Sequence, residues 1–363
     1  MSSRITEARA FLVDIAVETE RTDAIQSFEK QETVFVEVKT SDGLTGLGYS
    51  YTIGTGGRAV LSMLRDHLVP RLIGLDADRI EAVWFALYSA TRATTTGAIT
   101  SLALAAVDTA MWDIGAQRAG LPLWRLAGGS RRDVPLYDTE GGWLHLPTET
   151  LVEGALASKA AGLSGVKLKI GKPTGSEDLE RLRAVREAVG SGFDIMVDAN
   201  QSMTAAEAIR RARLFDGLDL AWIEEPLPAD DIEGHRRLVA STATPIAVGE
   251  SMYSASQFRE YLVRGAAGIV QVDVARVGGI TPWLKVAHLA ETHNVDVCPH
   301  FLMELHVSLA AAVPNGRYVE HIPQLRAITR TQMEIVDGRA LAPETIGLGI
   351  DWDEDAISDR TVA

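Results

Sequence analysis

The 363-residue chain has one cysteine, no long apolar run and no cluster of positive charge. The single cysteine, Cys298, excludes an internal disulfide, and its place in an apolar stretch favours packing over nucleophilic chemistry. No stretch reaches the roughly 18 consecutive apolar residues of a membrane-spanning helix. The N-terminal residues also lack the cleavage pattern of a signal peptide. We therefore expect a cytoplasmic protein that has no membrane partner.

The charge balance excludes one class of partner. The chain has 49 acidic and 35 basic residues, which gives a formal net charge of −14. Nucleic-acid binding needs clustered positive charge to meet the phosphate backbone, so no nucleic-acid partner is expected. The apolar content of 46% and the charged content of 23% are those of an ordinary globular protein. A chain of this length has material for two structural units.

The first part of the chain predicts three strands followed by three helices. The strands are expected at 4–17, 32–40 and 44–53, and the helices at 59–72, 79–90 and 96–119. Residues 18–31, between the first two strands, are polar and show no periodicity, so we expect a mobile loop there. Strands followed by helices are typical of an α+β unit, which we place at residues 1–127.

From residue 134 the pattern changes to an alternation of strands and helices. Strands are expected at 134–139, 165–170, 194–198, 219–223, 245–249, 268–273, 295–299 and 317–320. Helical patterns lie between most of them, at 147–161, 176–189, 204–215, 254–264, 279–292 and 304–313. Such alternation indicates parallel strands with right-handed crossovers, and eight strands close most naturally into a TIM-type barrel, here over 128–324.

Two features limit the barrel prediction. An open doubly wound sheet is the alternative, but no GxGxxG follows the first strand to support a dinucleotide site. The tail, residues 325–363, does not continue the alternation, although residues 333–336 look like a strand. We expect this tail to return to the first unit.

Three acidic residues end consecutive predicted strands at equal intervals. Asp198, Glu224 and Glu250 are separated by 224 − 198 = 26 and 250 − 224 = 26 residues. Equivalent strand ends of a parallel barrel lie side by side, so these carboxylates are expected to converge above the barrel. Carboxylate oxygens suit a hard divalent cation such as Mg²⁺. Each acid alone is more often a helix cap or a solvated residue, so the regular triple is what predicts a metal site.

Two lysines share one face of the second barrel strand. Lys167 and Lys169 are two residues apart and alternate with apolar neighbours, so both are expected to point into the barrel. A nearby cation and a second ammonium would lower the pKa of such a lysine and make it a workable base. The alternative is a solvated edge strand.

Further ionisable groups end the later strands. Asp273 and His300 are 300 − 273 = 27 residues apart, so neighbouring strand ends would bring the carboxylate against the imidazole and raise its pKa. Glu320 ends the eighth strand, where it could face the metal or solvent. His145 follows the first barrel strand and is the strongest candidate among the other histidines.

These motifs together resemble one known family. VKLKI, VDANQ, IEEP, VGE, the Asp273–His300 pair and Glu320 are similar to the mandelate racemase subgroup of the enolase superfamily, over the whole chain. The stretches 141–145, 231–235, 276–280 and 299–304 resemble those of galactarate/talarate-type acid-sugar dehydratases. The resemblance implies an α/β fold: a modified TIM barrel, (β/α)7β, under an α+β capping domain that the C-terminal tail completes.

The resemblance also implies roles for the site residues. One Mg²⁺ per subunit would be held by Asp198, Glu224 and Glu250. Lys169 would be the base on one face of the substrate, and His300, held by Asp273, the acid or base on the other. Lys167, as an electrostatic partner beside the substrate carboxylate, and Glu320, as a hydrogen-bond partner of that carboxylate, would serve in both catalysis and substrate binding. Asn200, His145 and Tyr51 are further candidates for substrate binding.

The implied activity is removal of a proton next to a carboxylate. Protonation of a β-hydroxyl by His300 would give a dehydratase that forms a 2-keto-3-deoxy acid, whereas return of the proton to the α-carbon would give a racemase or epimerase. A non-catalytic metal-binding scaffold is the third reading, and it predicts loss of at least one site residue. The family also implies a homo-oligomer, from dimer to octamer.

The substrate is expected to be a small hydroxylated carboxylic acid. The dehydratases carry basic residues just after the turn that corresponds to residues 49–51. In this chain no basic residue occurs from Tyr49 until Arg58. This departure argues against a diacid. Arg21, Lys30 or Arg92 could supply the missing charge.

Overall fold

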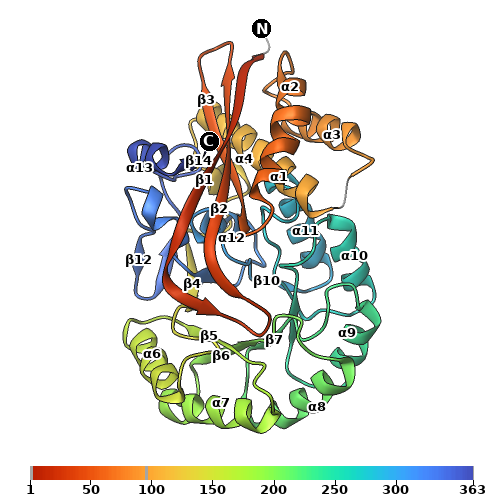
Figure 1. Ribbon diagram of the computed structural model, residues 1–363, viewed down its shortest axis with the longest axis vertical. Coiled ribbons are helices and arrows are strands. Elements are labelled where there is room, and N and C mark those ends of the chain that lie inside the picture. Colours follow the sequence, from red (N-terminus) through yellow and green to blue (C-terminus); the bar gives the residue numbers. More distant parts are fainter. Residues whose placement is uncertain (1–2, 95–96, 363) are drawn as a thin grey trace.

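The computed structural model describes residues 3–362 apart from residues 95 and 96. An elongated antiparallel sheet and its helices lie against a parallel barrel surrounded by helices (Figure 1). Among the described residues, no helix is long and apolar enough to cross a bilayer.

The N-terminal unit is built on a four-stranded antiparallel sheet in the order β14-β1-β2-β3. Its strands are β1 (Ile5–Thr22), β2 (Ser27–Thr40), β3 (Thr45–Ile53) and β14 (Thr361–Val362). The helices are α1 (Gly57–Ser62), a π-helical segment (Met63–Leu68), α2 (Val69–Leu72), α3 (Ile80–Ala90) and α4 (Ala98–Ala119). The expected start of the last helix at Thr96 lies outside the described residues.

Helix α4 packs closely on the sheet because two glycines of β3 have no side chains. A Cβ added to Gly48 would lie 2.2 Å from the carbonyl oxygen of Ala106, and one added to Gly46 would lie 2.4 Å from that of Ala110. The α4 residues from Leu102 to Ala106 are all buried, as an alanine-rich helix with apolar residues on every face requires.

The expected mobile loop at residues 18–31 is wrong. These residues extend β1 and β2 into a hairpin, with Arg21 opposite Phe28 and Thr22 opposite Ser27. The tight turn at its tip is closed by the amide of Asp23, which donates to the carbonyl of Gln26 (3.1 Å). The side chains are polar because much of this extension is exposed, so hydrophobic alternation is weak although the backbone pairs as a strand.

The barrel is an alternation of eight parallel strands and seven α-helices within residues 128–324, all of which the structure describes. The strands are β4 (Asp133–Asp138), β5 (Gly165–Lys169), β6 (Asp194–Asp198), β7 (Trp222–Glu224), β8 (Ile246–Val248), β9 (Ile269–Val270), β10 (Asp296–Val297) and β11 (Val319–His321). The helices are α6 (Thr148–Ala160), α7 (Gly175–Val189), α8 (Ala205–Phe215), α9 (Ile232–Val239), α10 (Ala255–Val263), α11 (Ile280–Thr292) and α12 (Met303–Ala312).

The ring of strands closes on both sides of β11. This strand pairs with β4 in parallel, while Val297 of β10 bridges to Gly316 and accepts a hydrogen bond from the amide of Arg317 (2.9 Å). The (β/α)7β barrel predicted from the sequence is therefore confirmed. Helix α9 was not predicted: it has only eight residues, and its buried face consists of Gly234, His235 and Leu238.

The C-terminal tail contacts both units. After a 3-10 turn (Gln324–Ile328), β12 (Ile335–Val336) and β13 (Arg339–Leu341) form a hairpin that pairs antiparallel with β4 of the barrel. The later part of the tail reaches the N-terminal unit: the Trp352 ring lies 5.1 Å from the ring of Phe35 on β2 and 5.2 Å from that of Tyr49 on β3, and after α13 (Glu354–Asp359) strand β14 pairs with β1.

A buried carboxylate joins the two units. Asp108 on α4 accepts hydrogen bonds from the backbone amide (2.8 Å) and the hydroxyl (2.7 Å) of Thr281, at the start of barrel helix α11. Gly279 leaves room for this contact, because an added Cβ would lie 2.4 Å from an Asp108 oxygen. Burial raises the pKa of Asp108 to about 7, although the hydrogen bonds from Thr281 lower it.

We expect Asp108→Ala to lower the free energy of unfolding by about 1–3 kcal/mol, because two buried donors lose their acceptor. Asp108→Asn should retain most of the stability, because the amide can accept from the backbone N–H and donate to the hydroxyl. The folded-state pKa of Asp108 lies above its unfolded value, so its contribution to stability falls as the pH rises from about 4 to about 7 and is constant above.

Denaturant unfolding at pH 5 and pH 8 measures both effects. Asp355→Ala, at an exposed position on α13, is the control and should change little. Equal stabilities of Asp108→Ala and wild type would contradict the role assigned to this contact.

Candidate active site

Three carboxylates converge at the C-terminal ends of the barrel strands. Asp198 ends β6, Glu224 ends β7 and Glu250 follows β8, and one oxygen of each lies within 4.8 Å of the others. All three side chains are buried. A close set of carboxylate oxygens is the donor set that a hard divalent cation prefers, so this cluster could hold a metal ion.

Two buried lysines balance the charge of this cluster. Lys167 Nζ lies 2.9 Å from Glu224 Oε1 and 2.8 Å from Glu320 Oε1, and Lys169 Nζ lies 2.5 Å from Asp198 Oδ2. Strand β5 is paired on both sides and buried along its length, which rules out a solvated edge strand. The buried carboxylates are thus in direct contact with two ammonium groups.

The pKa of Lys169 differs in direction from the sequence-based expectation. Burial and the charge of Lys167 lower the pKa of the Lys169 ammonium, but the carboxylates, led by Asp198, outweigh them and raise it. Burial also raises the pKa of Glu224 to about 7, against the effect of Lys167. The expectation of a lowered lysine pKa assumed a bound cation; in the protein alone the carboxylates retain their full attraction for the ammonium.

Asp273 and His300 form the predicted pair. Asp273 Oδ2 lies 2.9 Å from His300 Nδ1, and the acceptor-only carboxylate places the ring proton on that nitrogen. The other ring nitrogen, Nε2, lies 3.3 Å from Glu250 Oε2. Burial lowers the pKa of His300, but Glu250 and Asp273 outweigh it and raise the value. The imidazole is therefore oriented with Nε2 towards the carboxylate cluster.

Tyr51 reaches this pair from the N-terminal sheet. Its hydroxyl donates to Asp273 Oδ2 (2.6 Å), the same oxygen that accepts from His300. The side chain is buried beside the Phe301 ring, with 4.7 Å between the ring centroids. The hydroxyl of Tyr51 is thus committed to the Asp273–His300 pair.

Arg276 belongs to the site but was assigned no role from the sequence. Its Nη1 donates to the backbone carbonyl of Glu250 (2.9 Å), and its guanidinium lies 5.8 Å from the centroid of the Tyr51 ring. It follows Asp273 by three residues, so its position after a strand-end acid was the signal that could have identified it. Arg276 connects Glu250 to the Asp273 side of the site.

Glu320 and Asn200 complete the cluster. Glu320 is buried and accepts from the hydroxyl of Thr139 (2.7 Å) and the amide of Phe301 (2.8 Å), so it does not face solvent. The backbone N–H of Asn200 donates to Asp198 Oδ1 (2.9 Å), while the buried side-chain Oδ1 of Asn200 has no hydrogen-bond partner among the described residues. Asn200 and Phe301 have φ of 44° and 58°, left-handed conformations that are costly outside glycine and often occur at functional sites.

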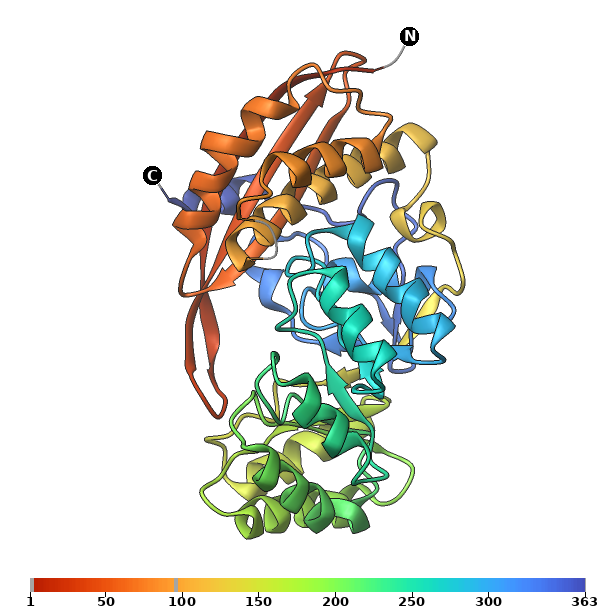
Figure 2. The same ribbon diagram turned by 90° about the vertical axis from the view of Figure 1, so that its right-hand side faces the viewer.

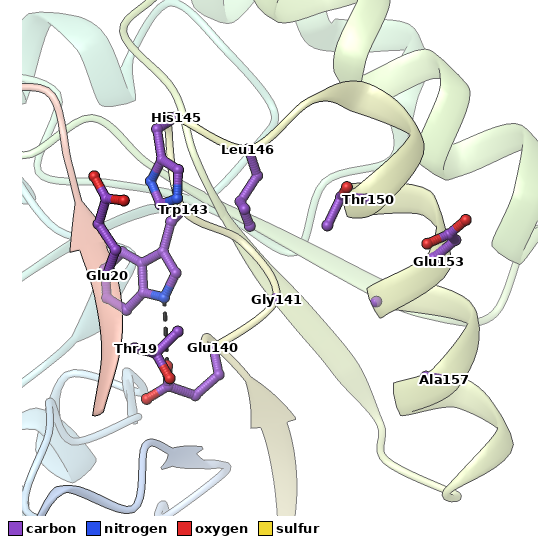
Figure 3. Close-up of a pocket in the computed structure, with 11 residues that line it drawn as sticks. Thr19, Glu20, Glu140, Gly141, Trp143, His145, Leu146, Thr150, Glu153 and Ala157 are labelled. Atoms are coloured by element: carbon purple, nitrogen blue, oxygen red, sulfur yellow. Dashed lines mark hydrogen bonds between the residues drawn. The ribbon is translucent and has the colours of Figure 1, made fainter. Parts of the chain in front are cut away.

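His145 lies apart from this cluster. Its Nδ1 lies 2.7 Å from the hydroxyl of Thr22, and it lines a cavity of about 490 Å³ beside the barrel mouth (Figure 3). Trp143 also lines that cavity, and its ring centroid lies 5.5 Å from Lys169 Nζ. The cavity is bordered by Glu20, Glu140 and Glu153. It is therefore an acidic recess adjoining the site at Trp143.

The fold and site together define a class of protein: a (β/α)7β barrel with a capping unit and an acidic, metal-competent centre at the strand ends. Two family models match the chain, the mandelate racemase/muconate lactonizing enzyme N-terminal domain at residues 8–128 and the enolase C-terminal domain-like model at residues 150–356. The chain belongs to the mandelate racemase/muconate lactonizing enzyme family of the enolase superfamily.

Named relatives support this assignment. The L-talarate/galactarate dehydratase of Salmonella typhimurium is 39% identical, over 89% of this chain and 81% of that protein. The 3,6-anhydro-alpha-L-galactonate cycloisomerase of Streptomyces coelicolor is 37% identical, over 95% and 96%. The crystal structure of L-talarate dehydratase from a Polaromonas species, in complex with Mg and L-glucarate, superposes with a TM-score of 0.95 at 39% identity, over 100% of this chain and 98% of that one.

We expect a divalent cation to bind at Asp198, Glu224 and Glu250 and to raise the thermal unfolding midpoint, because an ion that binds only the folded state stabilises it by mass action. Glu250→Gln should weaken that binding by more than the roughly 10- to 100-fold typical of a lost supporting residue. Calorimetric titration with Mg²⁺ and Mn²⁺ and melting with and without EDTA would measure both effects. Glu233→Gln, at an exposed carboxylate on α9, is the matched control. Equal affinities in the two variants would argue against the site.

Proposed function

We propose that the protein is a Mg²⁺-dependent acid-sugar dehydratase, a lyase that removes the proton next to the carboxylate of a hydroxylated acid and eliminates the β-hydroxyl. The observation that carries this proposal is the placement of two proton-transfer groups around the carboxylate cluster. Lys169 on β5 and His300 after β10 flank strands β6–β8, which supply Asp198, Glu224 and Glu250. Relatives named as dehydratases of sugar acids support the same chemistry.

The residues present fit one Mg²⁺, which Asp198, Glu224 and Glu250 would hold. When bound, the ion would stabilise the negative charge that develops on the substrate carboxylate as the α-proton leaves. Lys167 and Glu320, 2.8 Å apart, would contact that carboxylate, with Lys167 as an electrostatic partner. Asn200 has a buried side-chain oxygen available for the bound acid.

The proton moves in two steps. The Nζ amine of Lys169 takes the α-proton, and the electron pair of that C–H bond forms an enediolate. His300, as the imidazolium that its raised pKa favours, then donates the Nε2 proton to the β-hydroxyl and keeps the proton on Nδ1; the C–O bond breaks, and water leaves. The resulting enol takes up a proton at carbon 3 and becomes the 2-keto-3-deoxy acid. Asp273 and Tyr51 keep Nε2 of His300 aimed at the leaving group throughout.

The base must be a neutral amine for the first step. Asp198, the carboxylate that contributes most to raising the pKa of Lys169, is also one of the three proposed metal ligands. A carboxylate that is neutralised by a divalent ion attracts an ammonium less, so an ion held by Asp198 would lower the pKa of Lys169. Metal binding would then favour the neutral amine that the first step needs.

Racemisation or epimerisation is the second candidate function. The two groups flank the cluster from different strands, so His300 could return a proton to the α-carbon on the face opposite to Lys169. The scaffold reading, by contrast, required the loss of a site residue, and all of them are present and connected by hydrogen bonds or ion pairs.

We expect Lys169→Met and His300→Asn each to lower the rate of product formation by about 10²–10⁴-fold, the usual contribution of a positioned acid or base. A panel of sugar acids with Mg²⁺ in D₂O, followed by semicarbazide trapping of keto acid and by proton NMR, would measure dehydration and α-deuteration separately. Lys285→Met and His288→Asn, exposed on α11, are matched controls. Deuteration without keto acid would reject dehydration in favour of racemisation or epimerisation.

We also propose that the protein forms a homo-oligomer, from dimer to octamer, and that it is located in the cytoplasm. The exposed apolar side chains of Phe85 and Val263, which are 63% and 65% accessible, are surfaces that a subunit contact would cover. Light scattering coupled to size exclusion should give a mass at least twice 39.1 kDa. A mass of a single chain at micromolar concentration would contradict the oligomer.

A further inference from the structure

We propose that Asp23 selects the substrate: its carboxylate accepts a hydrogen bond from a hydroxyl of the bound acid and disfavours acids with a second carboxylate. This inference rests on the proposed function, because it concerns the same site. It adds a residue from the N-terminal hairpin that the sequence analysis did not single out, and it names monocarboxylic polyhydroxy acids as the substrate class.

The hairpin that contains Asp23 reaches from the N-terminal sheet to the mouth of the barrel (Figures 1 and 2). The carbonyl of Thr22 accepts a hydrogen bond from the amide of Leu144, which lies in the loop after β4. Two residues further on, the Cβ of Ala24 lies only 2.8 Å from where a Cβ added to Gly171 would lie, and Gly171 closely follows β5. The tip of the hairpin therefore packs on the end of the strand that supplies Lys169.

The two carboxylate oxygens of Asp23 have different environments. Oδ1 accepts from the amides of Ile25 (2.7 Å) and Gln26 (2.9 Å) and so closes the turn. Oδ2 is buried and has no hydrogen-bond partner among the described residues, and the whole residue is only 7% exposed. A buried acceptor without a donor is costly, so a ligand that supplies a donor gains affinity.

The charges of the proposed site also shift the pKa of Asp23. Burial raises the pKa of Asp23, the hydrogen bonds of the turn lower it, and the charge of Lys169 lowers it while that of Asp198 raises it. The Asp23 carboxyl group is therefore close enough to Lys169 and Asp198 for both charges to act on it.

The chemistry of an ionised carboxylate decides which donor it selects. It only accepts hydrogen bonds, so it pairs with a hydroxyl and repels a second carboxylate. The cations that could offset this repulsion are already engaged: the guanidinium of Arg21 pairs with Glu140, and Lys30 pairs with Asp14 (2.6 Å). Arg92 likewise has interactions of its own. These cations thus have acidic partners or other interactions of their own, and the repulsion between Asp23 and a second carboxylate is not offset by them.

The experiment compares an aldonic acid with the aldaric acid of the same chain length and hydroxyl configuration. Asp23→Asn keeps an oxygen to close the turn but replaces the unpartnered oxygen by a neutral donor. We expect wild type to prefer the monoacid in kcat/KM by at least tenfold, and Asp23→Asn to reduce that preference by a similar factor, mainly through KM. Removal of the terminal hydroxyl from the aldonic acid should weaken its binding to wild type. The same removal should weaken binding to Asp23→Asn by a smaller factor.

A matched control sits on the same turn. Ile25→Ala changes a side chain that is 62% exposed, so it should leave the monoacid-to-diacid ratio unchanged. Asp23→Ser offers a second test, because serine can also close the turn through its hydroxyl. A variant that merely disturbs the hairpin would lower kcat/KM for both acids by the same factor. Loss of selection would instead change the monoacid-to-diacid ratio of kcat/KM.

Calorimetric binding of both acids to the Mg²⁺-loaded protein separates this inference from the proposed function. If the protein turns over the acids and Asp23→Asn leaves the monoacid-to-diacid ratio of kcat/KM unchanged, the role of Asp23 is overturned and the proposed function stands. A ratio of dissociation constants that shifts in the variant, without turnover of either acid, would support Asp23 and overturn the proposed dehydration. Preference of wild type for the diacid, or binding of neither acid, would overturn the inference.

Discussion

Buried charges of both signs are held in contact at the mouth of the barrel, and the arrangement of the strand ends must keep them balanced. Three carboxylates lie within 4.8 Å of one another in a region that excludes water, where like charges repel strongly. Lys167 and Lys169 offset that repulsion from the neighbouring strand. Removal of either partner would leave a buried charge uncompensated, which is far more costly than loss of a surface ion pair. The eight strand ends are the framework that holds these charges in contact.

The same carboxylates serve two kinds of partner. In the protein alone they attract the lysines and raise the pKa of both ammonium groups, against the effect of burial. If they also hold Mg²⁺, that attraction weakens and Lys169 can act as a base. Charge compensation would then be a property of the resting protein, and base strength a consequence of metal loading.

The two structural units divide the work. In the proposed mechanism, both groups that transfer protons, Lys169 and His300, belong to the barrel. The N-terminal unit supplies Tyr51, which contacts the Asp273–His300 pair, and Asp23 at the tip of the hairpin. Their placement requires a rigid joint between the units. Asp108 provides one hydrogen-bonded contact to Thr281, and Trp84 donates another to the carbonyl of Gly278 (2.9 Å). These contacts hold the loop after Asp273 against the helices of the capping unit.

Sequence reasoning predicted the barrel and the residues at its strand ends because both follow from a local regularity. One strand, one helix and two loops take a nearly constant length, so equal spacing places Asp198, Glu224 and Glu250 side by side. Prediction failed where the local pattern was weak. Residues 18–22 and 27–31 form strands despite a polar composition, because backbone pairing with a neighbouring strand needs no hydrophobic alternation. Helix α9 was too short to show its period.

The alternation of elements, the barrel and the acids, lysines and histidine at its mouth could therefore be read from the chain alone. The group that each of these residues contacts could not, because it depends on tertiary packing. The hydrogen bond between Tyr51 and Asp273 joins residues 222 positions apart. The unpartnered oxygen of Asp23 is likewise a consequence of how the hairpin packs on the barrel. Such contacts depend on the relative placement of two units, and no local pattern in the chain encodes that placement.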